Sequence, residues 1–513
     1  MKNLKIITLF LTISFVLAAI CISCSSNYTD TDTQNDNQND QNEGQNAPAN
    51  QTGANGQNNQ QESATERLYP NLEEKDFGGY EFRILARTSS HIDWAKWEHR
   101  DIYAEEETGD PINDAVYKRN RYAEEKYNFV ISQILSESHQ ANLTKSIKSA
   151  SDDYDLYYST LDDLSGSVTT GNYMNLKDFP VINLDAPWWD SNARDSLSIG
   201  GKLYFCPSDL ILLHNNAAAA VIFNKEMIRD YAIEDPYSLV LSGNWTVDKL
   251  ISMTKDIYRD VNGDGIMDEN DLYGFACYRD AVLAVMHAGG GRICEKDGND
   301  LPYLTINSET AMAALDKAFD LMYAPSAWNQ HKELEPRGLP VYDTTERMVM
   351  ENRVLFYSVL LRDVEQFRNM DADFGIIPLP KLTGTQENYG SAVNRYVGRA
   401  LAIPSTVSDK GRTGTILEAL TAESKYTLIP AYYETTLQRK VSRDDESEGM
   451  LDIIFDNRIY DPGTIYNFGN YAGDIIMMTM KNDRNIVSLY EKSENKAVKD
   501  IEKLLENLQK LEN

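Results

Sequence analysis

The sequence predicts an α/β protein with two domains. Short apolar stretches with strand-like composition alternate along the chain with longer stretches in which apolar residues recur at helical spacing. This alternation is typical of α/β architecture. The part of the chain that can build a core starts near Arg67 and has about 445 residues, which is too many for one hydrophobic core.

The expected elements can be placed in order along the chain. Strands are expected at 80–86, 129–131, 154–159, 217–223, 354–358 and 374–380. Helices are expected at 110–127, 246–258, 345–351 and 411–422, and from 485 to the C-terminus. Pro378 and Pro380 should end the last strand, because proline cannot donate a ladder hydrogen bond.

The N-terminus has the layout of a secretory signal. Two lysines precede an apolar run at 6–22, and small residues follow it. Cys24 resembles the cysteine of a bacterial lipoprotein signal, which is acylated, for example with palmitate, and becomes the mature N-terminus after residues 1–23 are removed. Cys21 is the alternative lipidation site, and an uncleaved membrane anchor is the alternative to cleavage. Each alternative predicts that the rest of the chain lies outside the cytoplasmic membrane.

Residues 24–65 are expected to form a disordered tether. They are rich in Asn, Gln and Asp and contain one aromatic residue, Tyr28. Such a segment buries too little apolar surface to offset the entropy of ordering. Its r.m.s. reach of about 35 Å would hold a folded body clear of the lipid headgroups.

Composition excludes several function classes. The formal net charge of −30 repels polyanions, so nucleic acid is not an expected partner. Beyond the signal region the cysteines are Cys206, Cys277 and Cys294, with no CxxC spacing, and we expect buried free thiols. The six histidines show no HxxxH arrangement, which argues against a zinc enzyme.

Residues 260–271 follow the pattern of a calcium loop. Ca²⁺ binds six to eight oxygens, and Gly265 stands where such a loop turns sharply. The expected ligands are the side chains of Asp260, Asn262, Asp264, Asp268 and Asp271 and the backbone carbonyl of Ile266. A helix should enter the loop and a strand at 272–275 should leave it, so we expect a structural calcium clip rather than a sensor. A solvated turn without metal is the alternative.

Several segments together resemble one family. They are the helix start 244–250, the loop and strand 260–275, the hairpin 289–299, the helix start 307–311, the strand 374–380 and the C-terminal runs 430–433, 442–444 and 450–455. Their order resembles the extracellular solute-binding lipoproteins of ABC importers, in the family 1, maltose-binding-protein-like superfamily. The C-terminal runs resemble a clostridial branch of these proteins.

The resemblance implies a two-lobe periplasmic-binding-protein-like fold, with hinge strands and a ligand cleft between the lobes. Lobe one would comprise 66–207 and 342–394, and lobe two 208–341 and 395–513. The lobes would close around a bound solute as rigid bodies. The implied protein is a monomer without enzymatic activity that passes its solute to ABC permease subunits while a lipid anchor holds it to the membrane.

The expected solute is a carbohydrate, in particular an oligosaccharide. Sugar sites combine stacked aromatic rings with planar polar side chains, and the chain contains 30 Tyr and six Trp. The candidate ligand-binding residues are Trp94, Trp97, Trp188, Trp189, Asp190, Tyr278, Arg279, Tyr357 and Arg362. Trp188 and Trp189 stand out, because two adjacent tryptophans do not easily point into one core. Packing is the alternative for each aromatic residue, and it is the expectation for Trp245.

Two other function classes remain open at this point. A surface glycoside-active enzyme would need two carboxylates about 5 to 10 Å apart, and the sequence shows no named glycosidase signature. A peptide-binding or signalling receptor could have the same fold without any role in transport.

Overall fold

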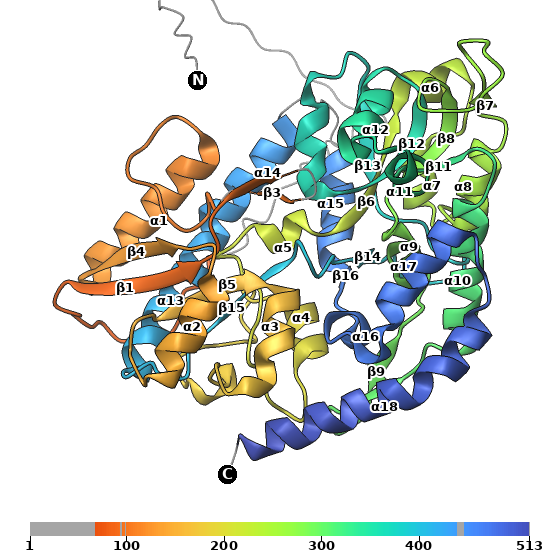
Figure 1. Cartoon of the computed structure of the whole chain (residues 1–513). Helices are drawn as coiled ribbons and strands as arrows, with labels where there is room; N and C mark the ends of the chain where they lie inside the picture. The colour runs from red at the N-terminus through yellow and green to blue at the C-terminus, as the bar shows by residue number, and fades with distance from the viewer. Residues whose placement is uncertain (1–66, 93–94, 98, 439–445, 512–513) are drawn as a thin grey trace, which may run out of the picture. The chain divides into compact units, whose positions relative to one another are not determined.

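The structure, a computed structural model, describes residues 67–92, 95–97, 99–438 and 446–511 (Figure 1). The predicted signal peptide 1–23, the lipidation site Cys24, the tether 24–65 and Trp94 lie outside these residues. Within the described part of the chain, no helix has both the length and the apolar character that a membrane span requires.

The first lobe is built on a four-stranded sheet with the order β15-β5-β1-β4. Its strands are β1 (Tyr80–Ala86), β4 (Phe129–Leu135), β5 (Leu156–Thr160) and β15 (Arg399–Ala402). Strand β1 pairs in parallel with β4 and β5, and β15 is antiparallel to β5. The helices of this lobe are α1 (Pro111–Tyr127), α2 (His139–Lys148), α3 (Leu161–Ser167), α4 (Ser191–Leu197), α13 (Lys410–Tyr426) and α14 (Leu428–Gln438) (Figure 1).

The second lobe is built on a sheet with the order β11-β8-β12-β6-β13. Its strands are β6 (Ala219–Asn224), β8 (Leu272–Cys277), β11 (Ala327–Asn329), β12 (Val354–Leu360) and β13 (Phe374–Ile377). Strand β6 is antiparallel to both β12 and β13, whereas β8 is parallel to β11 and β12. The longer helices of this lobe are α8 (Val247–Thr254), α9 (Ala281–Ala288), α10 (Glu309–Met322), α12 (Val341–Met350), α15 (Glu446–Asp456), α17 (Tyr471–Lys481) and α18 (Ile486–Lys510).

The expected strands and helices are confirmed, and local chemistry explains where they end. The carboxylate of Asp110 caps α1 by accepting the backbone N–H groups of Ile112 and Asn113 at 3.1 and 3.0 Å. Helix α1 ends at Asn128, which adopts a left-handed conformation with φ of 50°. Strand β13 ends directly before Pro378, as the sequence predicts.

Two described segments carry the chain between the sheets at residues 206–218 and 393–399, and we call 393–399 the crossing segment. Cys206 bridges to Leu401 and Ala218 to Val393, so the two segments run side by side. A short parallel ladder of β14 (Ser391–Ala392) and β16 (Arg458–Ile459) lies next to them. These contacts form the hinge region of the fold.

Strand pairing differs from the expected lobe division. Strands β12 and β13 come from 342–394, expected in lobe one, yet they pair with strands of the second sheet. Strand β15 comes from 395–513, expected in lobe two, yet it pairs with β5 of the first sheet. The reason is that an antiparallel strand follows each crossing directly, β6 after the first and β15 after the second, and each joins the sheet that the chain has just reached.

Two expectations about buried side chains are confirmed. Cys206, Cys277 and Cys294 are free and buried. Trp245 is fully buried, and its indole N–H donates to the carbonyl oxygen of Pro378 at 2.9 Å. Both observations match packing roles.

Candidate functional site

The carboxyl ends of both sheets meet at the crossing segment. After β5, the backbone N–H groups of Leu161 and Asp162 donate to the carbonyl oxygens of Gly398 and Arg395 at 2.9 and 3.1 Å. After β12, the N–H of Leu361 donates to the carbonyl oxygen of Ala218 at 3.0 Å, next to the crossing segment. In open α/β sheets, ligands bind outside the carboxyl ends of the strands. The topology therefore locates the candidate site in the cleft at the crossing segment.

Four of the predicted ligand-binding residues gather on the second-lobe side of this cleft. Tyr278 and Arg279 directly follow β8, Tyr357 lies in β12, and Arg362 is the second residue after β12. Since β8 and β12 are parallel neighbours, their carboxyl ends lie at one edge of the sheet. The pairing of β8 with β12 thus brings two separate sequence clusters to one edge of the sheet, and their role in binding stays a prediction.

Charged partners position the polar side chains of this group. Arg279 pairs with Glu335 at 3.4 Å and with Asp280 at 3.6 Å, and its side chain is 42% exposed. Arg362 pairs with Asp363 at 3.1 Å. Burial raises the pKa of Asp280, although the charge of Arg279 opposes this shift. The edge therefore offers the partly exposed guanidinium of Arg279 and the buried carboxyl group of Asp280.

Tyr357 is a supporting residue rather than a stacking surface. Its side chain is 4% exposed, and its hydroxyl donates to Oε1 of Gln330 at 3.0 Å. Its ring packs edge-on against Phe367. A ring enclosed in this way has no face available to a solute.

A small pocket of about 50 Å³ lies where the crossing segment faces α9. Tyr278, Asp280, Asn394, Arg395 and Tyr396 contribute to its lining. The side-chain amide of Asn394 donates to Asp280 at 3.4 Å and so joins the crossing segment to the second sheet. A pocket of this size has room for a few water molecules and not for a sugar ring, so a solute would be bound mainly against its rim in this arrangement of the lobes.

Tyr396 presents an aromatic ring at this rim. The ring is 43% exposed, and the guanidinium carbon of Arg395 lies 4.7 Å from its centroid. Arg395 also donates to the Tyr396 hydroxyl at 2.9 Å, pairs with Asp162 at 3.0 Å and donates to the carbonyl oxygen of Thr464 at 2.8 Å. Neither Arg395 nor Tyr396 is among the ligand-binding residues predicted from the sequence. The signal that could have identified them is their position directly before β15, where the chain changes lobe.

Trp188 and Trp189 are corrected from ligand-stacking residues to core residues. Each is 3% exposed, so neither ring is open to a solute. Their indole N–H groups donate to the two oxygens of one carboxylate, that of Glu418, both at 3.0 Å. This shared acceptor is what allows two adjacent tryptophans to be buried together. Burial raises the pKa of Glu418 to about 7.

Asp190 is likewise a structural residue. It is 5% exposed and caps α4 by accepting the backbone N–H of Ala193 at 2.9 Å. It also accepts from the Tyr460 hydroxyl at 2.7 Å and pairs with Nε of Arg458 at 2.8 Å. Asp190 therefore fastens the β16 strand of the hinge region to the first lobe.

Trp94 and Trp97 stay predictions. Trp94 lies outside the described residues. Trp97 ends the short strand β3 (Ala95–Trp97), but its side chain is outside the described part.

The loop that is predicted to bind calcium, 260–271, follows a strand, whereas a helix was expected before it. Helix α8 ends at Thr254, and a short strand, β7 (Tyr258–Arg259), pairs antiparallel with β8, so the loop connects two strands. The carboxylate of Asp260 accepts the N–H groups of Gly263 and Gly265 at 2.6 and 2.8 Å, and Asp271 accepts those of Val261 and Asp268, both at 2.9 Å. No three His, Cys, Asp or Glu side chains among the described residues are placed to hold a metal ion. The calcium clip stays a prediction.

Comparisons with known proteins support the fold. No protein-family model and no curated protein sequence matches the chain. The structure is similar to a cyclo/maltodextrin-binding protein complexed with maltotetraose, with a TM-score of 0.53 and 15% identity over 83% of this chain and 97% of that chain. It is also similar to the ABC substrate-binding protein Lmo0181 from Listeria monocytogenes in complex with cycloalternan (TM-score 0.50, 12% identity, 83% of this chain and 98% of that chain). A third similar structure is UspC of M. tuberculosis (TM-score 0.53, 14% identity, 82% of this chain and 100% of that chain). The chain therefore has the two-lobe α/β fold of periplasmic-type solute-binding proteins.

Proposed function

We propose that this protein captures a carbohydrate in the cleft at the crossing segment and delivers it to an ABC importer. The observation that carries the proposal is the convergence of both sheet edges on a rim with one open aromatic ring, that of Tyr396, and several charged groups. Two proteins of similar fold were solved with maltotetraose and cycloalternan, which supports a saccharide as the solute class.

The chemistry of the rim suits a sugar. A sugar ring has an apolar C–H face, which packs on an aromatic face such as that of Tyr396. Its hydroxyl groups both donate and accept, so they can meet the carboxyl group of Asp280 and the exposed guanidinium of Arg279. Tyr278 directly precedes Arg279 and Asp280 in the sequence, and it lines the same pocket as Asp280. We therefore assign Tyr278, Arg279, Asp280 and Tyr396 to solute binding, with Arg395 positioning the ring of Tyr396.

Lipidation of Cys24 and a flexible tether at 24–65 would hold this body at the outer face of the cytoplasmic membrane. The support is the lysine-led apolar run before Cys24 and the polar composition after it. A solute captured there has to reach permease subunits in the same membrane, and a tethered carrier keeps it close to them.

A screen with product analysis tests the proposal. The full chain is titrated with maltotetraose, cycloalternan and a peptide library, and melting is followed, because a ligand that binds the native state alone raises the apparent stability. We expect at least one saccharide to raise the melting temperature and to be recovered unchanged after incubation. A saccharide that is hydrolysed would support an enzyme instead, and a shift with peptides alone would overturn the carbohydrate assignment.

A further inference from the structure

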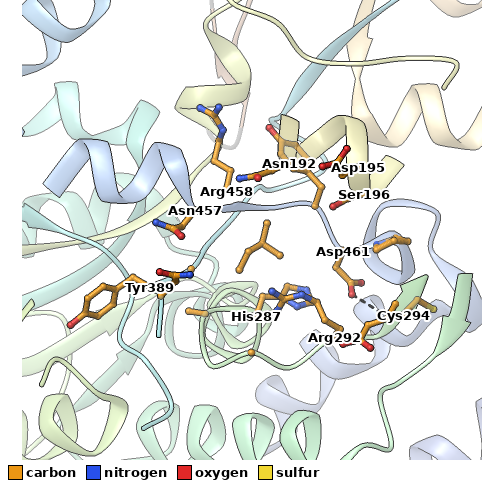
Figure 2. Close-up of a pocket in the computed structure, with 18 of the residues that line it drawn as sticks. Asn192, Asp195, Ser196, His287, Arg292, Cys294, Tyr389, Asn457, Arg458 and Asp461 are labelled. Atoms are coloured by element: carbon orange, nitrogen blue, oxygen red, sulfur yellow. Dashed lines mark hydrogen bonds between the residues drawn. The ribbon is translucent and has the colours of Figure 1, made fainter. Parts of the chain in front are cut away.

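A second cavity, of about 460 Å³, lies between α4 of the first lobe and the hairpin of β9 (Cys294–Lys296) and β10 (Pro302–Leu304) in the second. Figure 2 shows Asn192, Asp195 and Ser196 on one side of it and His287 and Arg292 on the opposite side. We call this cavity the crevice. Its volume is in the range of about 300 to 1,000 Å³ that is usual for small-molecule sites.

The crevice is separate from the pocket in the cleft. Of the residues that line the two cavities, His287 alone lines both. Its Nε2 lies 3.1 Å from Oγ1 of Thr464, and its Nδ1 lies 2.9 Å from the carbonyl oxygen of Gly291. His287 therefore lies at the boundary of the two cavities.

Hydrogen bonds of Asp461 and Lys296 hold the walls of the crevice in place. The carboxylate of Asp461 accepts the backbone N–H of Ile293, directly before β9, at 2.9 Å and that of Thr464, in α16 (Pro462–Ile465), at 2.6 Å. The ammonium of Lys296 donates to the backbone and the hydroxyl of Ser198, both at 2.9 Å, and so joins the hairpin to the first lobe. The crevice is therefore preformed in this arrangement of the lobes.

Arg292 provides hydrogen-bond donors on one side. Its Nη1 donates to the carbonyl oxygens of His287 and Gly291, both at 2.8 Å, and its other N–H groups have no partner among the described residues. Burial lowers the pKa of the Arg292 guanidinium, which reflects the cost of holding the charge there. Against this effect, the carboxylates of Asp461 and Glu295 act on the guanidinium through their charge and raise its pKa.

Carboxylates and amides provide acceptors and further donors around the opening. Asp195, Glu295 and Asp456 are exposed, and the side-chain amide of Asn192 donates to the backbone of Asp456 at 2.9 Å. Asp195 is paired with Arg194 at 2.7 Å, so Glu295 and Asp456 supply the negative charge that repels an anion at the opening. The guanidinium of Arg292 repels a cation. A neutral ligand with many hydroxyl groups meets both kinds of partner at once, because each hydroxyl donates and accepts.

We propose that the crevice binds a neutral polyhydroxylated ligand, a sugar or sugar-alcohol unit, at a site separate from the solute cleft. Because both lobes line the crevice, its ligand favours the arrangement of the lobes in which the crevice is assembled. Binding at the crevice and at the cleft are then thermodynamically coupled, and each ligand changes the affinity of the other by the same factor.

Saturation-transfer NMR on the full chain tests this proposal with glucose, mannitol and myo-inositol as probes. The experiment uses a cleft double variant, Tyr396→Ala with Asp280→Ala, so that failure of the proposed function does not affect the result. We expect at least one neutral polyol to give a signal with this variant, and Arg292→Gln added to it to weaken binding at least about 5-fold, roughly 1 kcal/mol. Arg229→Gln, at an exposed arginine with a side chain 71% open to solvent, should leave the signal unchanged.

Other outcomes overturn the crevice proposal. One is that no neutral polyol gives a signal with the cleft double variant. Another is that Arg292→Gln leaves polyol binding unchanged. A third is that galacturonate, which is negatively charged, or glucosamine, which is positively charged, binds more tightly than neutral galactose. If Arg292→Gln does not fold, Asn388→Leu at the exposed rim takes its place and should weaken the same signal. Loss of maltotetraose binding in the cleft, in contrast, bears on the proposed function and not on the crevice.

Discussion

The guanidinium of Arg395 lies 3.0 Å from the carboxylate of Asp162 and joins the crossing segment to the end of β5. The same guanidinium stacks beneath the ring of Tyr396, with 4.7 Å between its carbon and the ring centroid. One arginine thus fixes an open aromatic ring at the point where the lobes meet. In the proposed function, this ring is the surface on which a sugar packs.

Replacing Tyr396 with alanine should weaken carbohydrate binding about 5- to 150-fold. Losing a packed aromatic ring costs about 1 to 3 kcal/mol, and 1.4 kcal/mol corresponds to about tenfold in affinity. Titration calorimetry with a saccharide found in the screen measures the change. Tyr231→Ala is the matched control, since that ring is 40% exposed but lies outside the cleft. Equal affinity of Tyr396→Ala and wild type would remove Tyr396 from the site.

Replacing Trp189 with phenylalanine should lower stability and leave saccharide affinity unchanged. The indole N–H loses its bond to Glu418, and one carboxylate oxygen loses its buried donor, at a cost of about 1 to 3 kcal/mol. Urea unfolding and calorimetry on the same preparation separate the two effects. A loss of affinity without a loss of stability would return Trp189 to the ligand site.

Glu418 should make stability fall as the pH rises from about 4.5 to about 7. Its pKa is raised by burial from 4.5 to about 7 in the folded protein, so the folded state keeps a proton that the unfolded state loses in this window. Because the folded state binds more protons, the free energy of unfolding decreases with pH there, by up to about 3 kcal/mol. Glu418→Gln should flatten this part of the pH profile, whereas Glu73→Gln, on an exposed side chain, should not. A profile that keeps the same slope in Glu418→Gln would show that another group is responsible.

Calcium should stabilise the protein through the 260–271 loop without being needed for solute binding. A chelator is then expected to lower the melting temperature, and added Ca²⁺ to restore it, because the cation would draw together the loop oxygens. Asp260→Ala is a poor test by itself, since that carboxylate also holds the N–H groups of Gly263 and Gly265. The decisive comparison is the melting of the wild type with and without Ca²⁺. Identical melting in excess chelator would identify the loop as a turn without metal.

Cys24→Ala should release the protein from the membrane fraction, because acylation of that residue is the proposed anchor. Fractionation with metabolic labelling by a palmitate analogue measures both location and lipid. Should Cys21→Ala release the protein while Cys24→Ala does not, the lipid is on Cys21.

The pattern of neighbouring residues in the sequence predicts the helices and strands well, but it does not predict which side chains meet in the core. The β1 strand and the end of β13 follow from neighbouring residues, and both match. The role of Trp188 does not follow from its neighbours in the sequence. Its hydrogen-bond partner Glu418 lies 230 positions away and reaches it through the packing of α13. Tyr396 was missed for the same reason, since its place at the cleft depends on β15 pairing with β5.

Hydrogen-exchange mass spectrometry with a saturating saccharide shows whether a sugar binds at the crossing segment. We expect slower exchange in peptides that cover 278–284 and 393–399, because a solute in the cleft covers these backbones and favours closed lobes. A saccharide that binds without protecting either segment would contradict binding there.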